Sequence, residues 1–384
     1  MASRTYQSRM TVTENQATQR IARLTPLDAV LARIDALVGP VAPREVAPAA
    51  TFGRVLAGDL SVTPRPRAAV ALRDGWAVKS ELTTDASAYA PAPLPAAPWI
   101  NAGEPLPAGA DAVAEIDAVV PRDDRAQAVA PIVAGDGVLP AGTDVDLATA
   151  LLREGKRVSK VAAAVLAAAG IARAWVHDPG VRIVKARPGP DPIIDAARDL
   201  VARAVAAHGG SALVDPAGDM PIEEALQDES AHAVIAIGGT GGGRNDASVS
   251  ALARLGRVEA HGIALSPGET AAFGMIGARP VLLLPGRIDA ALVVWLLLGQ
   301  RMLARLTGSR EEPAAVSAKL TRKVASNLGL AELIPVRLRD GEAEPLGSGY
   351  LPLQTLARSD GWILVPPDRE GHPAGTSVMV RLWP

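Results

Sequence analysis

A loop with five glycines among six residues, 238–243, contains the residue types in this chain that best suit ligand binding. Residues 236–246 read Ala-Ile-Gly-Gly-Thr-Gly-Gly-Gly-Arg-Asn-Asp and follow an apolar stretch. Because glycine has no Cβ atom, the backbone N–H groups of such a loop can close on an anion, and a following helix adds free N–H groups. Asp246 suits a helix N-cap, a magnesium ligand or an acceptor for a ligand N–H. A tight strand-to-helix turn without ligand explains the run equally well.

A second turn between an apolar strand and a helix occurs at residues 282–289, around Pro285 and Gly286. In a parallel sheet, both loops would lie at the carboxyl ends of strands, where open α/β sheets bind ligands. A plain connection with Asp289 capping the helix is the simpler interpretation of this turn alone. The glycine run lacks the Gly-Lys-Ser/Thr of the Walker loop and the Gly-x-Gly-x-x-Gly spacing, which disfavours a nucleotide-dependent oxidoreductase.

Residues 180–308 are expected to form an α/β unit that positions these loops, because strand-like and helix-like periods alternate there. The expected strands are 181–184, 212–214, 233–237 and 281–284, and the expected helices are 192–208, 222–227, 248–255 and 290–306. This alternation implies a sheet with parallel pairs that is covered by helices on both faces.

The rest of the chain has other patterns. Apolar residues at helical spacing predict helices over 27–37, 149–155 and 161–170. Short alternating runs among many Pro and Gly residues predict strands and turns between 41 and 142. Beyond residue 313 we expect a small all-β module with strands at 333–338, 362–365 and 377–382.

Composition excludes several function classes. The 39 basic and 41 acidic residues give a net charge of −2, which offers no electrostatic footprint for nucleic acid. No cysteine is present, so disulfides, thiolate metal sites and cysteine nucleophiles are excluded. The most apolar stretch, 281–299, is broken by Pro285, Arg287 and Asp289, so about 18 uninterrupted apolar residues are never reached. The polar residues 1–24 predict a frayed tail, and we expect a cytoplasmic protein.

Taken in order, short motifs along the chain resemble the molybdopterin molybdenumtransferases, the MoeA and gephyrin E-domain family, of which the chain would be a diverged member. Residues 73–78, Arg-Asp-Gly-Trp-Ala-Val, resemble the family's Met-Asp-Gly-Tyr-Ala-Val, and residues 238–246 stand at its glycine loop. The other matches are Gly-Ala-Asp-Ala-Val at 109–113, Gly-Thr-Asp-Val at 142–145, Ser-Pro-Gly-Glu at 266–269, Leu-Pro-Gly at 284–286 and Gly-Ser-Gly at 347–349.

The resemblance implies a multidomain α/β and β protein. After the tail, 1–24, it implies an elongated helical dimerisation domain from 25–48 and 143–179, with a β-rich insert domain, 49–142, between its two parts. A molybdopterin-binding α/β domain, 180–312, and a C-terminal β-barrel, 313–384, would follow. Family members form homodimers, and the uncharged face of residues 161–170 suits close packing between helices.

The resemblance also implies an activity. Family members take adenylated molybdopterin and molybdate, release AMP in a Mg²⁺-dependent step and insert the metal at the dithiolene. A small pterin ligand and a second copy are therefore expected partners, together with other cofactor-assembly proteins or a client molybdoenzyme. Neither nucleic acid nor membrane is expected.

Residues transferred from the family's motifs define the expected site. The catalytic candidates are Asp74, Asn101, where the family commonly has Thr, Asp144 and Asp246, and the metal candidates are Asp246 and Asp219. The expected ligand-binding residues are Gly238, Gly239, Thr240, Gly241, Gly242, Gly243, Pro267, Gly268, Pro285, Gly286 and Ser348.

Departures from the family are concentrated where the chemistry should occur. Its Thr-Gly-Asp-Glu-Leu is replaced at residues 185–189 by Lys-Ala-Arg-Pro-Gly, which removes the catalytic Glu. A Lys is replaced by Glu269, a change of two charges, each worth about 3–4 kcal/mol at ~4–6 Å and an effective dielectric near 20. Arg187, Arg244 or Arg287 would have to supply the cation that an oxyanion needs. The alternative is a catalytically degenerate pterin-binding carrier or scaffold.

Overall fold

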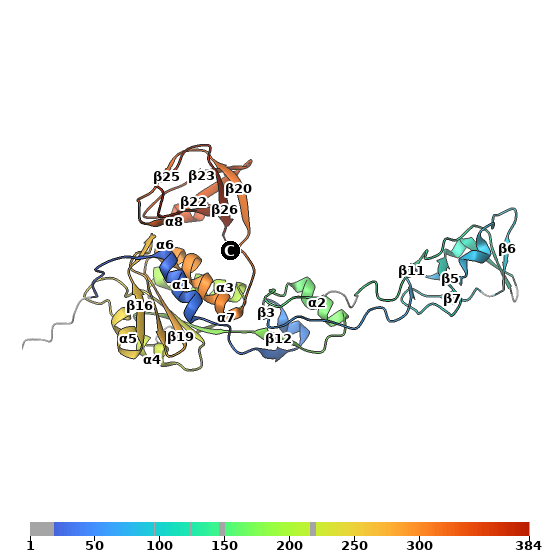
Figure 1. Cartoon of the computed structure of the whole chain (residues 1–384), viewed down its shortest axis with the longest axis horizontal. Helices are drawn as coiled ribbons and strands as arrows, with labels where there is room; N and C mark the ends of the chain where they lie inside the picture. The colour runs from blue at the N-terminus through green and yellow to red at the C-terminus, as the bar shows by residue number, and fades with distance from the viewer. Residues whose placement is uncertain (1–18, 96, 123–124, 146–149, 216–219, 384) are drawn as a thin grey trace, which may run out of the picture. The chain divides into compact units, whose positions relative to one another are not determined.

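The chain forms two compact units. The computed structural model describes residues 19–95, 97–122, 125–145, 150–215 and 220–383. The smaller unit comprises Gly58–Glu154 with Ala163–Ala174, and the rest of the chain belongs to the larger unit. The larger unit contains the predicted α/β domain and a closed β-barrel, and the smaller unit contains the predicted β-rich insert (Figure 1).

The α/β domain is built on a six-stranded sheet of order β14-β13-β15-β19-β18-β16. The first four strands pair in parallel, which confirms the predicted arrangement: β13 (Gly180–Lys185), β14 (Ser211–Val214), β15 (Ala233–Ile237) and β19 (Arg279–Leu284). The antiparallel strands β16 (Arg257–His261) and β18 (Ala272–Ile276) were not predicted. Both runs are only five residues long, with Gly262 directly after the first and Gly274 inside the second, so they lack a clear strand period.

Helices cover both faces of this sheet, as predicted (Figure 1). One face carries α1 (Leu27–Leu37), α3 (Pro192–Ala207), α6 (Ile288–Val294) and α7 (Gln300–Thr307); the other carries α4 (Ile222–Gln227) and α5 (Ser248–Leu255). Ile235 and Ile237 of β15 face the first core, whereas Val234 and Ala236 face the second. Burial on both faces explains why β15 is a continuous apolar run in the sequence.

The predicted helix 290–306 is longer and is not uniformly α-helical. A π-helical turn, Trp295–Gly299, joins α6 to α7. A Cβ atom on Gly299 would lie 2.4 Å from the Trp295 ring, so glycine lets that buried ring pack on the turn. By length and composition alone the helix Ile288–Thr307 could cross a membrane, but most of it is buried in the α/β core, as expected for a core helix.

Helix α1, which was expected in the dimerisation domain, packs against the core of the α/β domain. Leu27, Val30 and Ile34 are buried in the same core as α7, and Asp35 accepts a 2.7 Å hydrogen bond from Arg301 Nε. The Arg301 guanidinium lowers the pKa of the Asp35 carboxyl. An amphipathic helix shows in its sequence that it has an apolar face, but the partner of that face is decided by the tertiary fold.

A closed barrel follows the α/β domain, as predicted. Pairing runs around β22 (Ala331–Arg339), β23 (Glu342–Pro345), β20 (Ala315–Leu320), β26 (Ser377–Leu382) and β24 (Gly361–Val365), which pairs again with β22. Strand β17 (Ile263–Ser266) of the α/β domain pairs in parallel with β22, and β1 (Thr25–Pro26) pairs with β17. Backbone hydrogen bonds therefore join the barrel to the α/β domain.

The smaller unit contains short strands, as predicted. In one sheet β5 (Gly75–Val78) lies between β7 (Trp99–Ile100) and β8 (Ala112–Ala114). The other strands are β4 (Val70–Ala71), β6 (Ala92–Leu94), β9 (Val119–Arg122), β10 (Arg125–Ala128) and β11 (Val138–Leu139). The predicted helix 161–170 is α2 (Lys160–Ala168). The prediction of a helix at 149–155 is wrong for the described residues 150–155, because Leu152 instead forms an antiparallel bridge with Leu60.

The remaining short elements lie in the larger unit. They are β2 (Arg44–Val46), β3 (Val55–Leu56), β12 (Ala174–His177), which begins at the last residue of the smaller unit, β21 (Val324–Ala325), α8 (Leu353–Arg358) and β25 (Gly371–His372).

Candidate functional site

Three strand-to-helix loops lie side by side at the carboxyl ends of β13, β15 and β19. Gly238 N–H donates to Leu284 O at 2.8 Å, and Ala186 N–H donates to Ile237 O at 2.9 Å. A Cβ atom on Gly286 would lie 3.5 Å from Gly238 Cα. The glycine loop, residues 238–243, is therefore in contact with the Pro285–Gly286 turn, at the edge where open parallel sheets bind ligands.

The loop after β17 also reaches the glycine loop. The hydroxyls of Thr240 and Thr270 are 2.9 Å apart. Pro267 and Gly268, two expected ligand residues, are buried, and a Cβ atom on Gly268 would lie 2.8 Å from a methyl group of Val294 on α6. Gly268 therefore packs against the helix, and Thr270 is the residue of this loop that contacts the glycine loop.

Asp246 closes the glycine loop on itself. Its Oδ2 accepts the Gly243 N–H at 3.0 Å, and its own N–H donates to Gly243 O at 3.0 Å. The N-cap of α5 is Ala247, so Asp246 does not have the predicted N-cap role. Asp219 lies outside the described residues. Within the described ranges, no group of three His, Asp or Glu side chains could hold a metal ion by itself.

Arg287 occupies the turn after β19 and is held from two sides. Its Nε donates to Asp289 Oδ1 at 3.0 Å, and its Cζ lies 4.8 Å from the centre of the Tyr350 ring. Asp289 is only 1% exposed, and its Oδ2 also accepts the Leu351 N–H at 3.1 Å. The hydrogen bond to Asp289 raises the pKa of Arg287, so this half-exposed guanidinium is a permanent, oriented cation.

The barrel loop that contains Ser348 is anchored next to Arg287. Gly349 N–H donates to Oε1 of Glu332 at 2.8 Å, and Glu332 is 5% exposed. Tyr350 and Leu351, the next residues, make the contacts with Arg287 and Asp289 described above. Ser348 is exposed and precedes Tyr350 by two residues on this loop.

The cations near the site are not equivalent. Arg187 and Arg244 are exposed. Lys185 at the end of β13 is buried, and its Nζ lies 3.0 Å from Asp195 Oδ1, which lowers the pKa of that carboxyl. Asp289 is the main cause of the raised pKa of Arg287, and the negative charge of Glu269 adds a smaller contribution.

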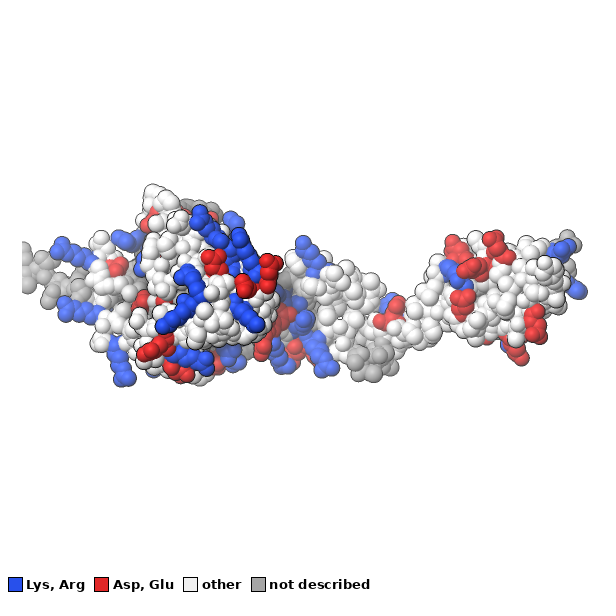
Figure 2. Space-filling view, turned by 90° about the horizontal axis from the view of Figure 1, so that it is seen from above, with Lys and Arg blue, Asp and Glu red and all other residues white. Residues whose placement is uncertain are grey.

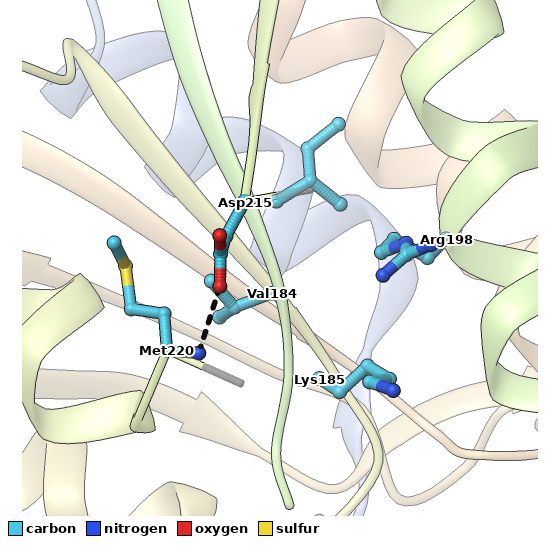
Figure 3. A pocket seen from close by; sticks show the side chains of 6 residues that line it. Val184, Lys185, Arg198, Asp215 and Met220 are labelled. Atoms are coloured by element: carbon cyan, nitrogen blue, oxygen red, sulfur yellow. Dashed lines mark hydrogen bonds between the residues drawn. The ribbon is translucent and has the colours of Figure 1, made fainter. Parts of the chain in front are cut away.

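A small pocket lies beside Lys185, on the β14 side of β13. Figure 3 shows Lys185 and Arg198 at this pocket, with Asp215 accepting the Met220 N–H at 3.2 Å. Its volume is about 10 Å³, far below the ~300–1,000 Å³ that is usual for ligand pockets. The pocket therefore suits neither a pterin nor a nucleotide.

In the smaller unit, two of the expected catalytic residues, Asp74 and Asn101, lie in neighbouring turns. Asp74 Oδ1 accepts the Ala102 N–H at 2.8 Å, next to Asn101. Asn101 Nδ2 donates to Glu104 Oε1 at 3.1 Å, and the hydrogen bond from the Asn101 backbone N–H lowers the pKa of Glu104. Asp144 is exposed in another turn, where its N–H donates to Arg65 O. The sequence indicated Asp74 and Asn101 but not Glu104.

The surface charge is mixed. On the face of the larger unit drawn in Figure 2, basic and acidic side chains are interspersed. Such a surface produces no field of one sign, so recognition of an anion has to come from local groups. In the described loops these are the guanidinium groups of Arg187, Arg244 and Arg287 and the backbone N–H groups of the glycine loop.

Comparison with known families matches the chain in three consecutive parts. Residues 25–170 match the MoeA N-terminal region (domain I and II), and residues 180–305 match the probable molybdopterin binding domain. Residues 317–383 match the MoeA C-terminal region (domain IV). The three matches follow one another without overlap along most of the chain.

Individual relatives are similar over most of their length. A molybdopterin biosynthesis protein of Methanocaldococcus jannaschii is 28% identical, over 81% of this chain and 85% of that protein. Molybdopterin molybdenumtransferase 1 of Mycobacterium tuberculosis is 29% identical, over 73% of this chain and 72% of the relative. The crystal structure of a molybdopterin biosynthesis MoeA protein of Pyrococcus horikoshii has a TM-score of 0.75 and 27% identity, covering 94% of this chain and 99% of that one.

Several side chains around the glycine loop were missed by the sequence interpretation. Gln19, Ser248, His261 and Thr270 all hydrogen-bond to this loop. Gln19 lies in the predicted tail 1–24, so the carboxyl end of that tail is ordered against the α/β domain. These four residues had no signal in the sequence, because each is a single polar residue outside any motif and its contact with the loop forms only in the folded chain.

We predict that Gly241→Val abolishes binding of inorganic pyrophosphate to the glycine loop. A Cβ atom at this position would lie 2.9 Å from Asp246 Oδ2, so a branched side chain must displace either Asp246 or the loop backbone. Titration calorimetry on wild type and variant measures the effect, and we expect the affinity to fall at least 10-fold.

Gly39→Val is the matched control, because a Cβ atom on Gly39 would meet no atom within 4 Å. Equal pyrophosphate affinity of Gly241→Val and wild type would show that the loop is only a structural turn.

Proposed function

Because this chain belongs to the MoeA family, we propose that it acts in molybdenum cofactor biosynthesis as a molybdopterin molybdenumtransferase. The observation that carries the proposal is the ordered match of all three family regions, with the molybdopterin-binding region covering the α/β domain. In this reaction molybdate is inserted into adenylated molybdopterin and AMP is released. Both the pterin and molybdate are therefore substrates.

The geometry of the larger unit supports a division of roles among its loops. The N–H groups of the glycine loop would bind the phosphates of the adenylated pterin, as backbone nests do. Arg287 would bind the molybdate dianion, because its guanidinium offers several N–H donors in a fixed plane. Ser348, on the barrel loop beside Arg287, would add a hydroxyl to the same anion.

Asp246 fits a role in holding Mg²⁺. Its Oδ2 is engaged by the Gly243 N–H, and its Oδ1 has no partner within the described residues. Mg²⁺ is commonly bound by one or two carboxylates together with substrate phosphates and water, so one protein carboxylate is sufficient here. Bound Mg²⁺ would neutralise phosphate charge as AMP departs. In the absence of Mg²⁺, Asp246 can accept an N–H from the pterin.

Asp74, Asn101 and Asp144 are proposed to serve the same reaction. The support for this role is the resemblance of residues 73–78 and 142–145 to family motifs, together with the hydrogen bond that fixes Asp74 next to Asn101. Asp74 is proposed to act at the site of a second copy of the chain.

The composition of the loop after β13 favours a second candidate function. Lys185 and Ala186 stand where the family's acidic motif is expected, and Lys185 is paired with Asp195. Without the family's catalytic Glu on this loop, the protein would bind adenylated molybdopterin as a carrier or scaffold and would not insert metal.

Purified protein supplied with adenylated molybdopterin, MgCl₂ and molybdate is expected to release AMP and to retain molybdenum on the pterin. Asp246→Asn should reduce Mg²⁺-dependent turnover more than it reduces affinity, because it removes a charge but keeps a hydrogen-bonding group. AMP and protein-bound molybdenum are measured by chromatography and elemental analysis. If the protein binds the pterin tightly but inserts no metal when supplied with either molybdate or tungstate, the result would support the carrier or scaffold function instead.

Arg287→Lys is predicted to raise the KM for molybdate at least 10-fold with a smaller effect on kcat, since Lys keeps the charge but loses the planar fork. Arg287→Ala should also lower stability by about 1–3 kcal/mol, because buried Asp289 loses a donor. Steady-state kinetics and thermal unfolding separate the two effects.

The matched control for Arg287→Lys is Arg254→Lys on α5, where the exposed arginine pairs with Glu223 at 3.0 Å. An unchanged KM for molybdate in Arg287→Lys would remove Arg287 from the oxyanion site.

A homodimer in the cytoplasm is part of the proposal, with other cofactor-assembly proteins or a client molybdoenzyme as further partners. Val161 and Val165 of α2 are 74% and 41% exposed and, being four residues apart, lie on one helix face.

We expect a dimer in sedimentation at micromolar concentration and a monomer for Val161→Asp/Val165→Asp. Val133→Asp, at another exposed valine, is the control and should remain dimeric. A monomeric wild type would contradict the dimer.

A further inference from the structure

Four consecutive carbonyl groups of the glycine loop accept hydrogen bonds from residues outside the loop. Ser248 Oγ donates to Gly238 O at 2.9 Å, and Ser248 N–H donates to Gly239 O at 3.1 Å. His261 Nε2 lies 3.0 Å from Thr240 O. Gln19 Nε2 donates to both Gly239 O and Gly241 O at 3.0 Å. Four consecutive carbonyls, from Gly238 to Gly241, are therefore satisfied.

The N–H groups of the same peptide units have no such partners. Within the described part of the chain, no hydrogen bond is donated by the N–H of Gly239, Thr240, Gly241 or Gly242. In a planar trans peptide the C=O of one residue and the N–H of the next point in opposite directions. Each group that binds a carbonyl therefore turns the following N–H away from itself, and the loop has one satisfied side and one free side.

Gln19 contributes more to this arrangement than any other single side chain. Its amide group donates to two of the four carbonyls, and its Oε1 accepts the Ser250 N–H in the first turn of α5 at 2.8 Å. The side chain is 9% exposed, so these bonds form with little competition from water. The reversed amide orientation would place Oε1 against two carbonyl oxygens, so the network fixes which atom is the donor.

We propose that Gln19 is a positioning residue for anion binding: by holding the Gly239 and Gly241 carbonyls, it orients the Thr240 and Gly242 N–H groups toward the phosphates of the substrate. The inference rests on the proposed function for the identity of the ligand. The segment that precedes α1 thereby becomes a part of the phosphate site, although Gln19 itself does not touch the substrate.

Gln19→Glu tests the proposal with almost no change in shape, because it replaces the two donor hydrogens by a carboxylate that repels both carbonyls. We expect affinity for adenylated molybdopterin to fall at least 10-fold in titration calorimetry, with faster amide exchange in the peptide spanning residues 238–247. KM should rise more than kcat falls, since the chemical groups are intact. Gln19→Ala should show the same changes to a smaller extent, because it removes the donors without adding a charge.

Gln227→Glu, at an exposed position at the end of α4, is the matched control and should behave as wild type in both measurements. A Gln19→Glu variant with a loosened loop but unchanged affinity would overturn the proposal, as would a variant with neither change. If Gln19 were purely structural, Gln19→Glu would lower the melting temperature, but its affinity for adenylated molybdopterin, measured well below that temperature, would equal that of wild type. That outcome would also overturn the proposal.

If the wild type itself binds no adenylated molybdopterin, the proposed function fails, and inorganic pyrophosphate decides the role of Gln19. This probe needs only the free N–H groups. A loss of pyrophosphate affinity in Gln19→Glu, but not in Gln227→Glu, would uphold the positioning role, and equal affinity in all three proteins would overturn it.

Discussion

The parallel pairing of β13, β15 and β19 is the constraint on which the candidate site depends. Parallel strands have their carboxyl ends at the same edge, so the loops that follow them must meet there. The hydrogen bond from Gly238 N–H to Leu284 O is the last of this pairing and brings the glycine loop against the Pro285–Gly286 turn. Burial on both faces keeps these strands in register, because a slip by one residue would exchange the side chains between two packed cores.

Charge at this edge has been redistributed relative to the family motifs. Glu269 brings a negative charge where a lysine is usual, and Arg287 brings a positive charge to the neighbouring turn. Arg287 is oriented by buried Asp289 and by the Tyr350 ring of the barrel. Because Asp289 also accepts the Leu351 N–H, the position of this cation depends on how the barrel is docked on the α/β domain. The pairing of β17 with β22 maintains that docking by backbone hydrogen bonds.

Two carbonyl groups of the glycine loop accept hydrogen bonds from Gln19, and these bonds connect the segment before α1 to the candidate site. Buried carbonyls require donors, and a loop of glycines supplies no side chains of its own to provide them. Gln19, Ser248 and His261 meet this requirement from three separate segments, which leaves the N–H side of the loop available. The side chains that shape the loop are therefore distinct from those proposed to touch the ligand.

The sequence by itself determined the parallel strands and the helices of the α/β domain, three strands of the barrel and the location of the glycine loop. These follow from local periodicity and from glycine's lack of a Cβ atom, and both are properties of short windows. The tertiary structure alone decided that α1 packs on the α/β core, that Leu152 pairs with Leu60 instead of forming a helix, and that Gln19 holds the glycine loop. Each of these depends on a partner distant along the chain, and Gln19 binds backbone carbonyls more than 200 residues away, which no local pattern can indicate.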